Sequence, residues 1–122
     1  MDFSLTDEQK LFQDSVTRFV ASEYDFMARR KVLETEAGYL PEHWATFAEL
    51  GWLAAPLPEE HGGLGGSPVE TMVVMEQFGR GLVVGPYLGT VVLGGAVLSA
   101  GGSDAQKAEL LPAVAEGNLR LA

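Results

Sequence analysis

The sequence has no cysteine and few basic residues. Among its 122 residues, 8 Lys and Arg stand against 17 Asp and Glu, for a formal net charge of −9. The absence of Cys excludes disulfides and thiolate metal sites, although it leaves the redox compartment open. The acidic balance argues against a nucleic-acid partner, because phosphates attract basic surfaces. It argues in the same way against an anionic membrane surface.

Charge is also missing from one long stretch, Leu82 to Ser103, which reads LVVGPYLGTVVLGGAVLSAGGS. Such a stretch is either the buried centre of a helical bundle or a membrane span, and a span needs about 20 consecutive apolar residues. Gly85-Pro86 and Gly101-Gly102 shorten the continuous helical part to Tyr87 to Ala100. We therefore predict a buried helix wrapped by amphipathic neighbours, with a membrane span as the alternative.

The N-terminus, MDFSLTDEQK, lacks the basic segment followed by an apolar one that marks a secretory signal peptide. This favours the cytoplasm. The length fits one domain with a real core. The hydrophobic content of 47% is typical of a folded, soluble chain.

Capping boxes predict where three helices begin. In the pattern S/T-x-x-E/Q, each side chain bonds to the backbone N–H of the other residue and opens a helix. The matching runs are Thr6 to Gln9, Ser67 to Glu70 and Ser103 to Gln106. Pro41, a residue favoured in the first turn of a helix, begins a further one, which ends at Gly51.

These starts and the uncharged stretch predict an all-α fold, an orthogonal or up-down bundle of about five helices. The first helix ends between Tyr24 and Arg29. The last is kinked or broken by Pro112 and ends at Gly117.

Several charged residues invite a chemical role. Arg29-Arg30-Lys31 could dock a phosphate or an acidic partner, but cations at a helix end also suit the helix dipole. Glu59-Glu60-His61 could form an acid/base cluster, although adjacent loop residues rarely converge on one point. His43 lies on the exposed face of its predicted helix, and no His, Asp or Glu stands at metal-binding spacing from it. We therefore predict no metal site.

The glycine-rich loop before Ser67 and the methionines after it also allow two interpretations. The loop HGGLGG leads into a helix, as phosphate-binding loops do. It lacks the G-x-G-x-x-G pattern and the Lys of a P-loop, so a tight turn needing positive φ is the simpler interpretation. Met72 and Met75 are predicted to fill the core rather than to contact a cofactor.

The C-terminal residues Asn118 to Ala122, NLRLA, alternate like the opening of a strand. We divide the chain into a helical domain, 1–117, and the start of a link or strand, 118–122, leading to a β-domain that this sequence lacks. The chain is therefore expected to be a piece of a longer protein or to be completed by another chain.

The helix order and its punctuation resemble the N-terminal helical domain of the acyl-CoA dehydrogenases. The similar runs are LTDEQKLFQDSV, LPEHWATFAELGWLAAPLPEEHGGLGG, VVMEQFGRGL and GGSDAQKAELLPAVAEGNLRLA, which together extend over essentially the whole chain. Within the family, YDFMARRKVL and VVGPYLGTVVLGGAVL look most similar to the small subunit of pimeloyl-CoA-dehydrogenase-like enzymes.

The resemblance implies helices packed beside a middle β-domain and a C-terminal four-helix domain, with FAD between those latter parts. It implies α,β-dehydrogenation of an acyl-CoA thioester, in which a glutamate base takes the α-proton and a hydride passes to the flavin. That glutamate and most FAD contacts lie downstream of this segment in the family, so no catalytic residue is assigned here and the segment alone is expected to be inactive. An electron-transferring flavoprotein, a large subunit and an oligomeric state are further implied.

The resemblance also implies that the uncharged helix lends one wall to the acyl-chain pocket. The candidate substrate-binding residues are Tyr87, Val91, Val92 and Gly95, and the simpler interpretation is that they are plain core. An alternative function is a stand-alone, non-catalytic helical module that pairs with another protein.

Overall fold

The computed structural model describes residues 1–122, and they form helices and no strand. This confirms the predicted all-α class. There are six α-helices, a π-helical segment η2 and a short 3₁₀ turn η1. Their bounds are α1 (Asp7–Glu23), α2 (Phe26–Leu33), α3 (Pro41–Glu49), η1 (Glu59–His61), α4 (Pro68–Gly81), η2 (Leu88–Gly95), α5 (Ala96–Gly101) and α6 (Asp104–Ala115).

All three predicted capping boxes form. The Thr6 hydroxyl accepts from the Gln9 amide at 3.1 Å, and the Ser103 hydroxyl accepts from the Gln106 amide at 3.2 Å. Ser67 and Glu70 form the corresponding pair at the start of α4. Each cap satisfies backbone donors that a helix start leaves unpaired, so these boundaries follow from local sequence alone.

Helix α2 was not predicted from the sequence. It begins separately from α1, because the Asp25 side chain accepts from the Ala28 amide at 2.8 Å and Tyr24 ends α1. Val32 on its inner side is buried. The basic triplet therefore lies in a helix of its own and not at the end of the first one.

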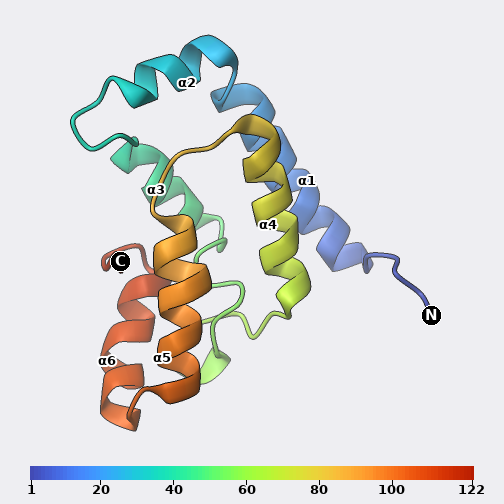
Figure 1. The fold of residues 1–122 in the computed structure, drawn as a ribbon. Coiled ribbons are helices and arrows are strands. Elements are labelled where there is room, and N and C mark those ends of the chain that lie inside the picture. Colours follow the sequence, from blue (N-terminus) through green and yellow to red (C-terminus); the bar gives the residue numbers. More distant parts are fainter.

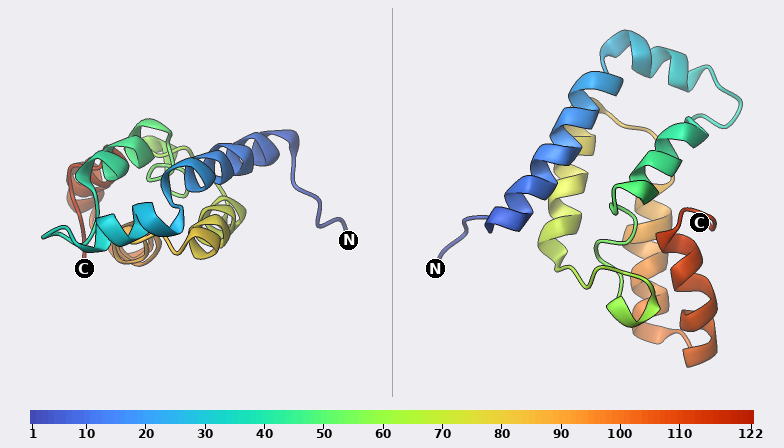
Figure 2. Two further views of the ribbon diagram at one scale, coloured as in Figure 1. Left: turned by 90° about the horizontal axis from the view of Figure 1, so that it is seen from above. Right: turned by 180° about the vertical axis from the view of Figure 1, so that it is seen from behind.

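Helices α1 and α4 lie side by side with their N-termini at the same end, whereas α6 runs antiparallel to η2 and α5 (Figure 1). Helix α3 lies between these two pairs, and α2 bridges α1 and α3 at one end (Figure 2). The core is rich in aromatic rings, with Phe47 stacked on Trp52 at a centroid distance of 5.2 Å and Phe78 at 5.0 Å from Phe47. Burying each such ring contributes about 1.5–3 kcal/mol.

The loop after α3 belongs to this core. It has no regular helix before η1, yet Trp52, Leu53 and Leu57 are among the largest fully buried side chains. The predicted turn at the glycines forms there, with positive φ at Gly62 and Gly65.

The uncharged stretch is not wrapped on all sides, which corrects the prediction of a fully buried helix. It forms η2 and α5, and Tyr87, Thr90 and Val91 face the core. Outward lie Leu88, Leu93 and Val97, exposed by 50%, 57% and 71%. A uniformly apolar sequence has no polar face to show this orientation. No helix of the structure has the length and apolarity needed to cross a membrane.

The end of the chain folds back onto η2. Helix α6 continues through Pro112 without breaking, contrary to one of the two predicted outcomes, and Gly117 ends it with φ of 77°. Residues 118–122 have no regular secondary structure, and Leu121 lies against Thr90. The predicted division of the chain at residue 117 stays a prediction.

Candidate functional site

The four predicted substrate-binding residues lie on or beside η2, and of these only Val91 and Val92 line a common groove. The buried Tyr87 hydroxyl donates to the Trp52 carbonyl oxygen at 3.1 Å, and burial raises its pKa. Val91 is buried, and a side chain added at Gly95 would meet the Leu57 methyl group at 2.9 Å. Their role in substrate binding therefore stays a prediction, and within this chain they pack against the core.

Val92 has a more open position. It is half-buried and borders a groove of about 330 Å³ between η2–α5 and the start of α4. The groove is lined by Pro56, Leu57, Gly66, Ser67, Pro68, Thr71, Val91, Val92, Ala96 and Ser99.

The exposed side of η2 and α5 forms a second, more apolar groove, which was not predicted from the sequence. We call Leu88, Leu93 and Val97 the apolar row. The groove runs beside Leu93 and Val97 of this row and has a volume of about 380 Å³. It is lined by Gly89, Leu93, Gly94, Val97, Leu98, Leu110, Leu121 and Ala122. Large contiguous apolar patches on a protein surface mark binding sites or interfaces, so this groove is a candidate for either. Gly89 and Gly94 are the sequence feature that could have indicated this groove, because a glycine adds no side chain to fill it.

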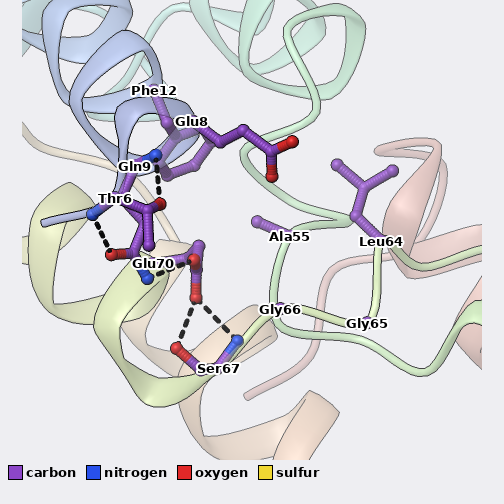
Figure 3. Close-up of a pocket in the computed structure, with 10 residues that line it drawn as sticks. All are labelled: Thr6, Glu8, Gln9, Phe12, Ala55, Leu64, Gly65, Gly66, Ser67 and Glu70. Atoms are coloured by element: carbon purple, nitrogen blue, oxygen red, sulfur yellow. Dashed lines mark hydrogen bonds between the residues drawn. The ribbon is translucent and has the colours of Figure 1, made fainter.

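A further pocket of about 480 Å³ lies where the N-termini of α1 and α4 meet (Figure 3). The Gln9 side-chain amide donates to Glu70 at 3.0 Å, which joins the two capping boxes into one network. The other Glu70 oxygen accepts from the Ser67 amide and hydroxyl, at 2.6 and 2.7 Å. Phe12 and Leu64 form the apolar side of the pocket.

The network sets the charge of Glu70. Desolvation alone would raise its pKa, but the hydrogen bonds from Ser67 and Gln9 outweigh that effect and lower the pKa below the ordinary value of 4.5. The Glu70 carboxylate therefore accepts hydrogen bonds from the N-terminal ends of both α1 and α4.

The glycine-rich loop does not form a phosphate cradle. Its four consecutive amides, Gly63 to Gly66, all donate to backbone carbonyls of residues 54 to 58. A side chain at Gly63 would overlap the Leu57 carbonyl, and one at Gly66 would overlap the Ala55 carbonyl. These glycines therefore permit a close backbone approach, and no free donors remain to bind an anion.

The other charged candidates do not converge either. The His61 imidazole lies 3.8 Å from Glu60, while the Glu59 side chain lies against Gly65. Arg29 donates through Nε to the Leu82 carbonyl oxygen at 2.8 Å and so caps α4, whereas Arg30 and Lys31 are exposed.

Two residues differ from their predicted burial: His43 was expected to be exposed and Met72 to be buried. His43 is largely buried between Phe19 and Tyr24, with ring centroids at 5.2 and 5.3 Å, and its Nδ1 has no hydrogen-bond partner. Met72 is exposed by 53%. Both predictions were wrong because α1 covers the side of α3 expected to be open, and nothing covers the outer side of α4 at Met72. Met75 packs against the core as predicted.

Comparison with known proteins agrees with this architecture. The family model of the acyl-CoA dehydrogenase N-terminal domain matches residues 6–118. The acyl-CoA dehydrogenase IpdE2 of Mycolicibacterium smegmatis is 36% identical over 114 residues, which cover 93% of this chain and 35% of that protein. The chain thus spans about a third of the length of the curated relatives it matches.

Solved structures show the same fold. The ChsE4–ChsE5 complex from Mycobacterium tuberculosis matches with a TM-score of 0.89 at 26% identity, over 98% of this chain and 33% of that chain. An acyl-CoA dehydrogenase from Bacillus anthracis, complexed with FAD, matches with a TM-score of 0.82 at 24% identity, over 97% and 20% of the two chains. The order of helices, the family match over 6–118 and these likenesses show that the chain belongs to the acyl-CoA dehydrogenase family, as its N-terminal domain.

Proposed function

We propose that this chain works as the N-terminal helical domain of a complete, flavin-dependent acyl-CoA dehydrogenase, which oxidises the α,β bond of an acyl-CoA thioester. Family membership and the partial coverage of the relatives support the proposal. The structural observation that carries it is the apolar row, an uncharged face that a helical domain leaves open to solvent when nothing covers it.

In this proposal the apolar row is the wall that touches the acyl chain. Leu93 and Val97 offer methyl groups, and Gly89 and Gly94 leave room for a chain to lie close to the backbone. Tyr87 and Gly95 act from behind, because their contacts with Trp52 and Leu57 hold the wall in place. Val91 and Val92 line the neighbouring groove.

The family resemblance assigns most FAD contacts to the remainder of the subunit, and no cofactor-binding residue is assigned within this chain. FAD is bound in the Bacillus anthracis relative, and when bound it would supply the hydride acceptor. This chain's part is to bind the acyl group and exclude water from it.

The proposal extends to partners. We include an electron-transferring flavoprotein as electron acceptor, an oligomeric state, and a large subunit if the likeness to pimeloyl-CoA-dehydrogenase small subunits extends to assembly. The ChsE4–ChsE5 relative is itself a complex. A cytoplasmic location remains part of the proposal.

A stand-alone helical interaction module is the second candidate function, because the same apolar row could bind the surface of another protein. The intact mass of the native gene product distinguishes the two. A mass well above 13.0 kDa supports the dehydrogenase. A mass equal to 13.0 kDa favours the module, unless a partner chain supplies flavin and base.

The wall itself is tested in the complete enzyme by Leu93→Trp. The added ring fills the groove beside Gly89 and Gly94, so we expect kcat/KM to fall about tenfold or more for long acyl-CoA esters and less for short ones. Leu33→Trp on α2, at a comparably exposed leucine away from the groove, is the matched control. An unchanged chain-length profile in Leu93→Trp would contradict the assignment.

A further inference from the structure

The apolar groove has one wall that is not part of the helix. Leu121 and Ala122 line it together with Gly89 and Gly94, so its width depends on where the C-terminal segment lies. That segment has no regular secondary structure of its own. The Asn118 and Leu119 amides donate to the Ala113 carbonyl oxygen of α6, and Leu121 is held by contacts with η2.

The Thr90 hydroxyl makes the main polar contact. The Leu121 amide donates to Thr90 Oγ1 at 3.0 Å, and the same hydroxyl donates to the Leu121 carbonyl oxygen at 3.2 Å. One hydroxyl has one proton to donate and lone pairs to accept with, so both bonds can form together. Thr90 thus supplies the donor and acceptor that a neighbouring strand residue would offer.

This use of a helical hydroxyl differs from that at three other helical positions. The hydroxyls of Thr17, Thr46 and Ser99 donate to carbonyls of their own helices, at Gln13, Glu42 and Gly95. That is the usual arrangement in a helix. Thr90 is fully buried within the π-helical segment and directs its hydroxyl to a residue 31 positions away.

Two glycines make room for the contact. A Cβ at Gly89 would lie 3.1 Å from the Leu121 carbonyl oxygen, and one at Gly94 would lie 2.7 Å from a Leu121 methyl carbon. The second distance is shorter than van der Waals contact allows. The Leu121 side chain therefore rests directly on the helix backbone at Gly94, between the two ends of the groove.

From these contacts we propose that Thr90 is a positioning residue that pins Leu121 and thereby sets the width of the acyl groove. The inference rests on the proposed function, because the groove's occupant is taken to be an acyl chain. Losing the hydroxyl leaves a part-buried amide and carbonyl of Leu121 unpaired, so the segment moves away from η2 and the groove widens.

The test uses Thr90→Val, which keeps the shape and removes the hydroxyl, in the complete native protein. Hydrogen exchange at the Leu121 amide is expected to accelerate about tenfold or more, because its protecting bond is lost. The ratio of kcat/KM for phenylpropanoyl-CoA to that for hexanoyl-CoA is expected to rise about fivefold or more, because a wider groove favours the bulkier group.

Three further variants make the result specific. Thr90→Ser retains the hydroxyl, so the exchange rate at the Leu121 amide and the substrate ratio are expected to stay near their wild-type values. Gly94→Ala displaces Leu121 from the other side and is expected to accelerate its exchange without touching the hydroxyl, which covers the case that Thr90→Val fails to fold. Thr17→Val, the same change on an exposed face of α1, is the control and leaves both readouts at the wild-type value.

The outcomes separate the two proposals. Unchanged exchange at Leu121 in Thr90→Val and Gly94→Ala overturns the clamp. Faster exchange with an unchanged substrate ratio shows a purely structural contact and overturns the role in groove width. If the wild-type protein oxidises no acyl-CoA, the proposed function fails, and the groove assignment fails with it, whatever the exchange data show.

Discussion

Leu82 is the one residue other than glycine with a left-handed backbone, with φ of 50° at the end of α4. That conformation costs about 1–2 kcal/mol for an L-residue. The side chain is exposed by 60%, so little packing offsets the cost. Leu82→Gly is predicted to raise the free energy of unfolding by about 0.5–1 kcal/mol, since the strain removed exceeds the added freedom of the unfolded chain. Urea denaturation measures the change.

Leu50→Gly provides the matched control for this prediction. Leu50 also ends a helix and is similarly exposed, but its φ is −82°, where glycine relieves no strain. We expect Leu50→Gly to lower the free energy of unfolding by about 0.5–1 kcal/mol. A Leu82→Gly protein no more stable than the wild type would contradict the strain at this residue.

Glu70 gives the fold a pH dependence. Its pKa is lower in the folded chain, so its carboxylate stabilises the fold above the ordinary value of 4.5, and this contribution is lost as the pH falls below it. Glu70→Gln is predicted to cost about 1 kcal/mol at neutral pH, the usual value of a helix cap. The difference from wild type narrows in acid, where the wild-type carboxyl is itself protonated.

Denaturation curves over a range of pH test this prediction. Glu76→Gln is the control, because Glu76 lies 3.8 Å from Arg80 in an exposed pair worth about 0–1 kcal/mol. A Glu70→Gln deficit that stays constant into acid would show that the carboxylate charge plays no part.

For single residues, the sequence predicts the interactions that depend only on neighbours in the chain. The capping boxes at Thr6, Ser67 and Ser103 need only their own neighbouring residues, and all three form. His43 and Met72 were misplaced because their burial depends on whether another helix covers them. That information is absent from the periodicity of a single helix.

Among the elements, the loop before α4 depends on close backbone approach. A Cβ at Gly63 would overlap the Leu57 carbonyl, which is backbone and cannot rotate away. Gly63→Ala is predicted to lower the free energy of unfolding by about 1–3 kcal/mol through overpacking. Thermal unfolding followed by circular dichroism reports the loss.

Gly79→Ala offers the opposite expectation within α4. Nothing lies within 4 Å of a Cβ at that position, so alanine is expected to stabilise the helix by about 0.5–1 kcal/mol. A Gly63→Ala protein as stable as the wild type, or stabilised as Gly79→Ala is expected to be, would show that the close approach at Gly63 is not a constraint.

Helix boundaries could be predicted from the sequence where a proline or glycine marks them. Pro41, Gly51 and Gly117 mark boundaries close to those observed. Helix α2 was missed because its basic residues fit equally well at the end of the preceding helix. The π-helical turn at η2 has no sequence signature in an uncharged run, and its exposed side shows only once the core takes up Tyr87 and Val91.

For the whole molecule, family and fold class were within reach of the sequence, because long runs with characteristic glycines and prolines match one family throughout. The candidate site was only partly so. The substrate-binding role predicted for residues of the uncharged segment stays a prediction. The groove at Gly89, Leu93 and Val97 was not predicted, because an apolar helix gives no hint of its open side. The apolar row follows from the arrangement of all the helices together.

The most direct measurement is an anaerobic titration of the complete native protein with an acyl-CoA ester, followed by the absorbance of the flavin. The proposed function predicts a bound flavin whose visible absorbance is bleached as acyl-CoA is added, with a slower or weaker response to long chains in Leu93→Trp. A native protein that carries no flavin, alone or with a partner chain, or a flavin that no acyl-CoA reduces, would contradict it.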